Sequence, residues 1–241
     1  MKLIIAFVVL LLIGVVVFGS CKACGKRGNG NVTIENRTIQ PFTKISIEGV
    51  FPVEISQDGD AEFVKVETDE NLQKYIKVKN DGDELVIKMD EDASVHKSKK
   101  MKVYINIKKL DELNFKSVGA LTTTGVLKVD SLELNSESVG KLDLNVDAGF
   151  LRTNLNSVGA TTLKGKAHEV RINNKSVGTL SAYDLKAGTL MIHNTAVGAV
   201  EVYADTAFYI RSSAIGTLYY KGPGVVKELE SEGIGKVKKA E

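Results

Sequence analysis

The tripeptide Ser-Val-Gly recurs through the second half of this 241-residue chain and strongly limits how the chain can fold. The motif and its close variants end on seven glycines: Gly119, Gly140, Gly159, Gly178, Gly198, Gly216 and Gly235. Successive members are 18 to 21 residues apart. A near-constant period of this length is typical of arrays in which each repeat stacks on the one before it. The ladder therefore predicts a repeat architecture.

Each period contains two short strand patterns. The residues two and four positions after a ladder glycine are mostly apolar and the residue between them is mostly polar, as in Leu142, Asp143 and Leu144. This alternation is typical of a strand that buries one face. A second apolar run follows later in the period, for example at Val170–Ile172 and Leu190–Ile192. Every period therefore supplies two strands in the same order.

Stacking the periods in phase predicts a parallel β-solenoid with about 19 to 20 residues per coil over residues 110–241. Coils about 4.8 Å apart would give seven coils a length on the order of 30 Å. We expect the Val or Ile before each ladder glycine to point inward, and the glycine to permit a corner. Asn135, Asn174 and Asn194 are expected to hydrogen-bond between coils. A leucine-rich repeat is the main rival, but its LxxLxL run is absent.

Residues 32–109 do not repeat and are expected to form a β-strand-rich cap over the N-terminal edge of the solenoid. The segment holds several short alternating runs, and Asp81-Gly82 between two of them indicates a hairpin turn. Solenoid ends expose unpaired strand edges, which need covering. At the other end, Lys239 falls at an inward position and is expected to protect the edge.

The first 20 residues have the pattern of a secretory signal peptide. Lys2 is followed by an apolar run from Leu3 to Phe18 and then by small residues. An uncleaved membrane anchor is the alternative, although about 20 apolar residues are needed to span a bilayer. Residues 21–31 are basic and rich in glycine, so we expect a flexible tether there.

Cys21 is the expected site of lipid attachment. Phe18-Gly19-Ser20-Cys21 resembles a bacterial lipobox, in which a small residue precedes the cysteine that is acylated, although lipoboxes usually carry an aliphatic residue where Phe18 stands. The second cysteine, Cys24, lies beside it. A disulfide between the two cysteines or two free thiols are the alternatives. The body of the chain has no cysteine on which its fold could depend.

The composition gives no sign of a nucleic-acid partner or of a metal or organic cofactor. The 32 basic and 30 acidic residues leave a net charge of +2, with both signs interspersed. The three histidines, His96, His168 and His193, lie at unequal positions of the repeat, and no spacing matches a zinc site. We therefore expect no cofactor and no metal.

An enzyme that acts on glycans would need two carboxyl groups that converge on one groove. Asp143 and Asp147 are the nearest candidates, but solvated charge on a strand face accounts for them more simply. Five tyrosines could form a modest aromatic strip, although cross-strand packing explains the same residues. They are Tyr183, Tyr203, Tyr209, Tyr219 and Tyr220. We expect no catalytic residue.

The chain resembles the putative auto-transporter adhesin, head GIN domain family of small exported proteins from Bacteroidetes-type bacteria. The features that carry the resemblance are the segment Arg37–Gly49 (RTIQPFTKISIEG), Val53–Gln57 (VEISQ) and the recurrent Ser-Val-Gly coils. The resemblance covers about residues 32–235, which suggests one domain. It implies a right-handed parallel β-helix and supplies no catalytic motif.

We therefore expect an exported protein, anchored in the membrane of the cell envelope by a lipid, that acts as a non-catalytic adhesion or ligand-binding surface. Its partner is expected to be a glycan or an envelope protein. A self-associating envelope scaffold and a carbohydrate-active enzyme are the alternatives. Recognition is expected in the cap or in the outward columns beside the ladder, such as Thr122, Asp143, Thr162 and Glu201.

Overall fold

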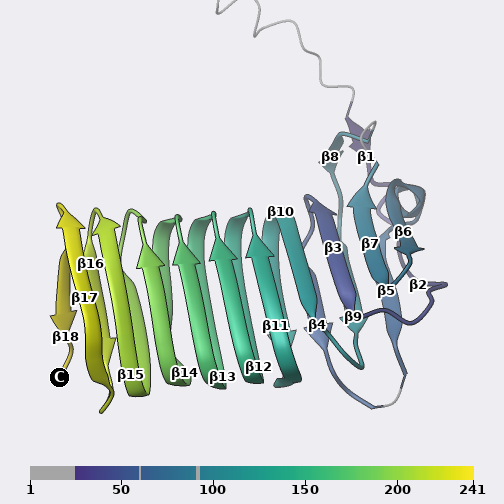
Figure 1. The fold of residues 1–241 in the computed structure, drawn as a ribbon. Helices are drawn as coiled ribbons and strands as arrows, with labels where there is room; N and C mark the ends of the chain where they lie inside the picture. Colours follow the sequence, from purple (N-terminus) through teal and green to yellow (C-terminus); the bar gives the residue numbers. More distant parts are fainter. Residues whose placement is uncertain (1–24, 60, 91–92) are drawn as a thin grey trace, which may run out of the picture.

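The protein is a rod of stacked β-coils with a smaller β-rich cap at its N-terminal end (Figure 1). The computed structural model describes residues 25–59, 61–90 and 93–241. The predicted signal peptide and Cys21 lie outside these residues. Within the described residues, no helix has the length and apolar character needed to cross a membrane.

The predicted parallel β-solenoid is confirmed, with about seven turns. Its strands pair in parallel with the equivalent strand of the next coil, so that Val139 lies beside Val158 and Val158 beside Val177. The solenoid strands are β10 (Glu112–Thr124), β11 (Leu127–Ser136), β12 (Val139–Leu155), β13 (Val158–Asn174), β14 (Val177–Asn194), β15 (Val200–Ala214), β16 (Thr217–Lys221), β17 (Val225–Gly233) and β18 (Lys236–Lys239).

Inward columns of apolar side chains form one continuous core along the rod. In the second strand of each coil, Leu132, Leu151, Val170, Leu190 and Phe208 lie in register on successive coils and are fully buried. Each layer therefore packs on an equivalent layer above and below it, and the apolar area removed from water grows with every coil.

The ladder glycines form corners that no other residue fits, as predicted. Gly159 has a φ of +135°, a region that L-residues with a side chain rarely adopt. A Cβ atom on Gly159 would lie 2.0 Å from the carbonyl oxygen of Gly140 on the preceding coil. Both the backbone conformation and the close stacking of the corners therefore require glycine.

The prediction that the residue before each ladder glycine points inward is wrong. These side chains are exposed by 43 to 57% in Val118, Val139, Val158, Val177, Val197 and Ile215, and Ile234 is more exposed still. The buried corner residue is instead the preceding serine in Ser117 and Ser138. Strand alternation explains the arrangement, because Val139 lies an odd number of residues from the inward Leu142.

Asparagines hydrogen-bond between coils as expected, but in two separate columns. Asn174 and Asn194 are buried, and the Asn174 Nδ2 donates to Asn194 Oδ1 at 3.1 Å. Asn135 lies one position earlier in its repeat and belongs to an outward column, where it donates to Asn114 Oδ1 at 2.9 Å. Five rather than four residues separate Asn135 from its ladder glycine, and this places it on the other face.

The cap continues the coils and then closes them with antiparallel strands. Its elements are β1 (Lys26–Arg27), β2 (Val32–Arg37), β3 (Lys44–Gly49), β4 (Val53–Ser56), β5 (Phe63–Asp69), the 3-10 helix η1 (Glu70–Tyr75), β6 (Ile76–Asp81), β7 (Glu84–Met89), β8 (Val95–Lys97) and β9 (Met101–Asn106). Strands β3 and β4 pair in parallel with β10. Strands β5 and β6 pair antiparallel with β9 and β7, and Gly82 occupies the predicted hairpin turn with a φ of +60°.

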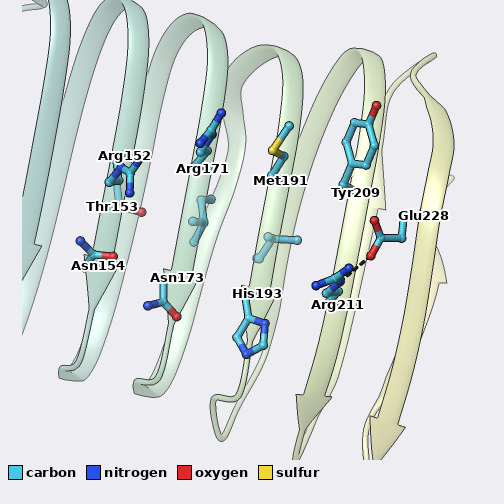
Figure 2. Close-up of a pocket in the computed structure, with 12 residues that line it drawn as sticks. Arg152, Thr153, Asn154, Arg171, Asn173, Met191, His193, Tyr209, Arg211 and Glu228 are labelled. Atoms are coloured by element: carbon cyan, nitrogen blue, oxygen red, sulfur yellow. Dashed lines mark hydrogen bonds and ion pairs between the residues drawn. The ribbon is translucent and has the colours of Figure 1, made fainter.

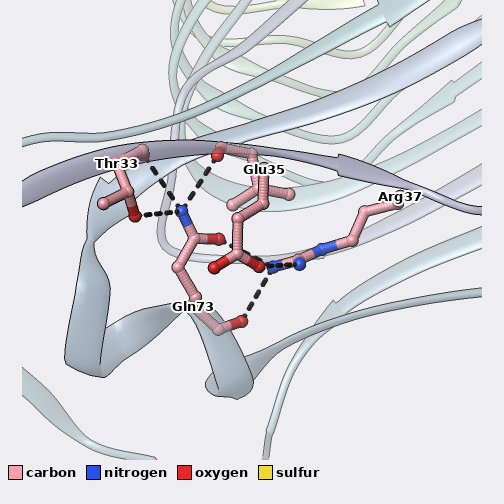
Figure 3. Close-up of polar contacts among 5 residues, drawn as sticks. Thr33, Glu35, Arg37 and Gln73 are labelled. Atoms are coloured by element: carbon pink, nitrogen blue, oxygen red, sulfur yellow. Dashed lines mark hydrogen bonds and ion pairs between the residues drawn. The ribbon is translucent and has the colours of Figure 1, made fainter.

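A buried glutamine joins three segments of the cap (Figure 3). The Gln73 Nε2 donates to the carbonyl oxygens of Thr33 and Val66 at 3.0 and 3.1 Å. The Arg37 guanidinium donates to Gln73 Oε1 at 2.7 Å and also contacts Glu35. Because its donors and its acceptor are paired, Gln73 can be buried between β2 and β5 without an unsatisfied polar atom.

Residues 26–31 are bound to the cap, although we expected a flexible tether there. Lys26 and Arg27 pair with β8, and the carboxylate of Asp69 accepts the Gly30 N–H at 2.6 Å and the Lys99 N–H at 2.7 Å. Burial alone would raise the pKa of Asp69, but these backbone donors outweigh it and lower the pKa. The buried charge therefore holds two loops together.

The C-terminal coil has no covering element among the described residues. Leu229 continues an inward column but is half exposed, because no further coil lies beyond β17. Lys239 pairs with Tyr220 in register and is exposed. The two last strands carry opposite charges. Strand β17 carries Glu228, Glu230 and Glu232 against one lysine, Lys227, and β18 carries Lys236, Lys238 and Lys239.

Candidate functional site

A groove of about 520 Å³ crosses the C-terminal parts of strands β12 to β15 and strand β17 (Figure 2). Two outward columns line it. One column holds Arg152, Arg171, Met191, Tyr209 and Glu228, and the other holds Asn154, Asn173, His193 and Arg211. Each coil from β12 to β15 therefore contributes two side chains to the same surface.

On each strand, the residues of the two columns are two positions apart. Both side chains therefore lie on the same outward face of the solenoid. Between them lies an inward column that includes Thr153, Ile172 and Ile192 and forms the floor of the groove. The repeat brings together residues that are 18 to 20 positions apart in the sequence. A lining side chain therefore recurs at every coil spacing of about 4.8 Å.

Three arginines give the groove its charge, and they differ in how they are held. The Arg171 Nε donates to Glu169 at 2.7 Å, while Arg211 binds Glu228 and also lies 3.3 Å from Glu230. These carboxylates raise the pKa of Arg211. The ion pair of Arg211 with Glu228 closes the C-terminal end of the groove (Figure 2).

Arg152 has no carboxylate partner within the described residues. Its guanidinium lies 5.7 Å from the centre of the Phe150 ring, and that of Arg171 lies 5.3 Å from the same ring. Stacking on an aromatic face orients a guanidinium and leaves its N–H donors available. The open end of the groove therefore presents donors suited to a carboxylate, a sulfate or a hydroxyl group.

The asparagine column next to the arginines is ordered by its own hydrogen bonds. The Asn154 Nδ2 donates to Asn135 Oδ1 at 2.7 Å, and Asn135 in turn donates to Asn114. Asn173 ends this run, because the next coil carries His193 at the same position. The column offers amide groups in fixed orientations, which suits a ligand with repeated polar groups.

The predicted outward residues lie on the other strand of each coil and form a separate column. Thr122, Asp143, Thr162 and Ser181 pair in register, and Ser181 pairs with Glu201. Asp143 lies 3.2 Å from Lys141 and 3.4 Å from Lys164. None of these residues lines the groove, so the column is a separate surface.

Asp143 and Asp147 do not make the pair of carboxyl groups that glycan hydrolysis needs. Asp147 pairs with Lys166 at 3.2 Å, whereas Asp143 pairs with other lysines. Asp147 lines a hollow beside Lys166 and His168 in which Asp143 has no part. The two carboxylates are therefore paired with different lysines.

The tyrosines do not form a common strip. Tyr209 lines the groove, whereas Tyr220 packs edge-on against the buried Phe208 with 5.3 Å between ring centres. The Tyr203 hydroxyl donates to Asp205 at 2.8 Å, and the Lys186 ammonium lies 3.7 Å from the centre of its ring. Burial, followed by the charge of Glu201, raises the pKa of Tyr183.

The histidines are separated, and the described part of the chain has no cluster of three or more His, Cys, Asp or Glu side chains that could hold a metal ion. His193 lines the groove, His168 lines another hollow, and His96 belongs to β8 in the cap. Sequence reasoning missed the groove, although the positions of Arg152 and Arg171 one period apart were a signal that it could have used.

A family model described as putative auto-transporter adhesin, head GIN domain, matches residues 41–224. No relative was found among curated proteins. A solved structure of a putative adhesin from Bacteroides fragilis is 24% identical, covers 90% of this chain and all of its own, and has a TM-score of 0.84. A putative lipid binding protein from Parabacteroides distasonis is 20% identical, with 90% and 99% coverage and a TM-score of 0.69. At these identities the two structures establish the shared fold.

Proposed function

Because the chain belongs to the putative auto-transporter adhesin, head GIN domain family, we propose that it is a non-catalytic adhesion protein exported to the cell envelope. Its membrane anchor is a lipid on Cys21, and its adhesive surface is the groove beside Arg152 and Arg171. The observation that supports this function is the groove itself, in which polar side chains recur at the coil spacing without an assembled reactive pair.

The ligand proposed for the groove is an extended glycan. A glycan presents hydroxyl and, in acidic polymers, carboxylate groups at regular intervals, and the two columns present guanidinium and amide groups at regular intervals. An envelope protein with an extended acidic segment is the other partner that we expected, and it would use the same donors.

Binding of the purified protein to a panel of neutral and acidic polysaccharides tests the proposal. Replacing Arg152 and Arg171 with alanine should weaken binding by about 10-fold or more, since hydrogen bonds to charged groups contribute about 1.5–3 kcal/mol each. The matched control replaces Lys77 and Lys79 on β6, which removes the same charge from the cap. Equal loss in both variants would show nonspecific charge attraction and contradict a specific site.

Catalysis is tested separately on the same polysaccharides. We expect no shortening of any glycan that binds, because Asp143 and Asp147 are each paired with lysine. An activity that disappears in Asp143→Asn or Asp147→Asn would instead support the carbohydrate-active enzyme.

Self-association is the second candidate function, and the open C-terminal coil favours it. Strand β17 is acidic, β18 is basic, and Leu229 is exposed between uncovered edges. Two copies could join acidic edge to basic edge. Light scattering decides the matter, because a protein that stays monomeric at high concentration cannot be a scaffold of this kind.

A further inference from the structure

The most unusual surface of the solenoid is a continuous row of exposed aliphatic side chains along one corner, here called the aliphatic ridge. It consists of Val50, Val118, Val139, Val158, Val177, Val197, Ile215 and Ile234. Neighbours in the row lie on adjacent coils, as shown by the pairs Val118–Val139 and Val197–Ile215. Val50 precedes Val118 in the row, because Gly49 pairs with Ser117.

Strand propensity does not explain why the ridge is aliphatic. Threonine has a similar preference for strands and is used at other outward positions, such as Thr122, Thr162 and Thr195. At the ridge every coil carries Val or Ile. A contiguous apolar surface of this kind marks a site of contact with another apolar body.

The ridge begins where residues 1–24 join the body. Val50 lines a hollow together with Val95 and Lys97 of β8, and β8 pairs with β1 at Lys26 and Arg27. Figure 1 shows β1 and β8 together at the N-terminal end of the rod. The described chain starts at Gly25, which is four residues after Cys21.

The short connection restricts how far the body can lie from a membrane. If Cys21 carries the lipid, as the proposed function holds, four extended residues reach about 14 Å at most. Residues after Gly25 cannot extend this reach, because Lys26 and Gly30 are hydrogen-bonded to the cap. The end of the rod that carries Val50 is therefore held close to the lipid headgroups.

The charges beside the ridge match an anionic lipid surface. Lys97, Lys99 and Lys100 line the same hollow as Val50. Four further lysines lie two residues from a ridge side chain, against three glutamates, Glu48, Glu137 and Glu232. These lysines are Lys116, Lys141, Lys175 and Lys236. An aliphatic row flanked by excess lysine suits the boundary between acyl chains and anionic headgroups.

We propose that the solenoid lies lengthwise on an anionic lipid bilayer with the aliphatic ridge against the membrane. The inference rests on the proposed membrane anchor and adds the orientation of the rod. The lipid surface is favoured over a second copy of the chain, because the proposed anchor holds the Val50 end of the ridge beside lipid at all times.

Tryptophan provides the test, because the chain contains none. Full-length Val50→Trp, Val158→Trp, Ile215→Trp and Lys166→Trp variants are reconstituted into vesicles of phosphatidylethanolamine and phosphatidylglycerol, with and without brominated acyl chains. Lys166 is exposed and lies about half a coil from the ridge, so its variant is the matched control. Flotation of the vesicles measures anchoring independently of fluorescence.

In the anchored protein, we expect bromine to quench the tryptophan fluorescence of the Val158→Trp and Ile215→Trp variants and to leave the Lys166→Trp control unquenched. Replacing Lys141, Lys175 and Lys236, which lie along the rod away from the anchored end, with glutamine should lower the ratio of lying to standing molecules by roughly fivefold per lysine. Quenching that occurs in Val50→Trp and not in Ile215→Trp means that the rod stands on its cap and overturns the inference.

Three other results also overturn the inference, and they separate it from the proposed function. Flotation without quenching at any position would mean that the protein is anchored but that the ridge does not contact the membrane. Failure of the protein to float with the vesicles would contradict both the proposed anchor and the inference. A third such result is a blue shift in the tryptophan emission of the Val158→Trp variant that occurs without vesicles and grows with protein concentration. It would mean that the ridge contacts a second copy of the chain.

Discussion

The ladder glycines give the sharpest test of how the solenoid is built, and Gly159→Ala is the most informative change. At Gly159 two requirements coincide. The backbone has a φ of +135°, and an added Cβ atom would lie 2.0 Å from the Gly140 carbonyl oxygen. Contacts of a Cβ atom under 3.0 Å essentially do not occur, so the two coils would have to separate locally by about 1 Å.

The expected loss of stability has two parts. Forcing alanine into this backbone region costs about 1–3 kcal/mol. Separating the coils at the corner also weakens inter-coil hydrogen bonds such as Val158 N–H to Ser138 O, which is 2.8 Å long, and each is worth about 0.5–1.5 kcal/mol. We expect Gly159→Ala to lower the free energy of unfolding by about 3–5 kcal/mol, measured by urea denaturation.

Gly125→Ala is the matched control, because it separates the two parts. Gly125 also has a positive φ, +75°, but nothing lies within 4 Å of an added Cβ atom. It should lose only about 1–2 kcal/mol, the cost of placing a side chain in that backbone region. If Gly159→Ala is no more destabilising than Gly125→Ala, close stacking of the corners does not explain the ladder.

Two other side chains allow quantitative predictions. Asp69→Asn should lower stability by about 1.5–3 kcal/mol at neutral pH, because the carboxylate accepts backbone N–H groups from Gly30 and Lys99. Its folded pKa lies below the ordinary value of 3.8, so this stabilisation is present above that pH and is lost as the pH falls through the folded pKa. Acid unfolding of the variant should therefore depend less on pH below about 4, and an unchanged acid profile would contradict the assignment. Thr153→Val should be neutral or stabilising by up to about 1–2 kcal/mol in thermal unfolding, because the buried Thr153 Oγ1 has no hydrogen-bond partner among the described residues. A clear loss of stability would show that the hydroxyl is hydrogen-bonded in solution.

The aliphatic ridge is the place where the sequence was sufficient for a correct prediction but our prediction was wrong. Because Val139 and its equivalents are hydrophobic, we predicted that they point inward. In a strand, however, every second residue from the inward Leu142 points inward, and Val139 is three residues away, so it points outward. The signal was therefore present in the sequence, in the alternation of the strand. The alternation holds through the glycine corner, where Ser138 is buried and Val139 is exposed.

The sequence alone determined the period, the parallel stacking and the corners. The same local preference recurs in all seven periods, so stacking the periods in phase places equivalent residues side by side. Only the tertiary structure showed the contacts made by residues that do not recur in the repeat. Asp69 reaches 39 residues back to Gly30 and fastens the start of the body to the cap. Phe150 lies beside the guanidinium groups of Arg152 and Arg171 and so shapes the open end of the groove. Such contacts depend on single residues that do not recur, for which no local pattern of hydrophobicity or spacing exists.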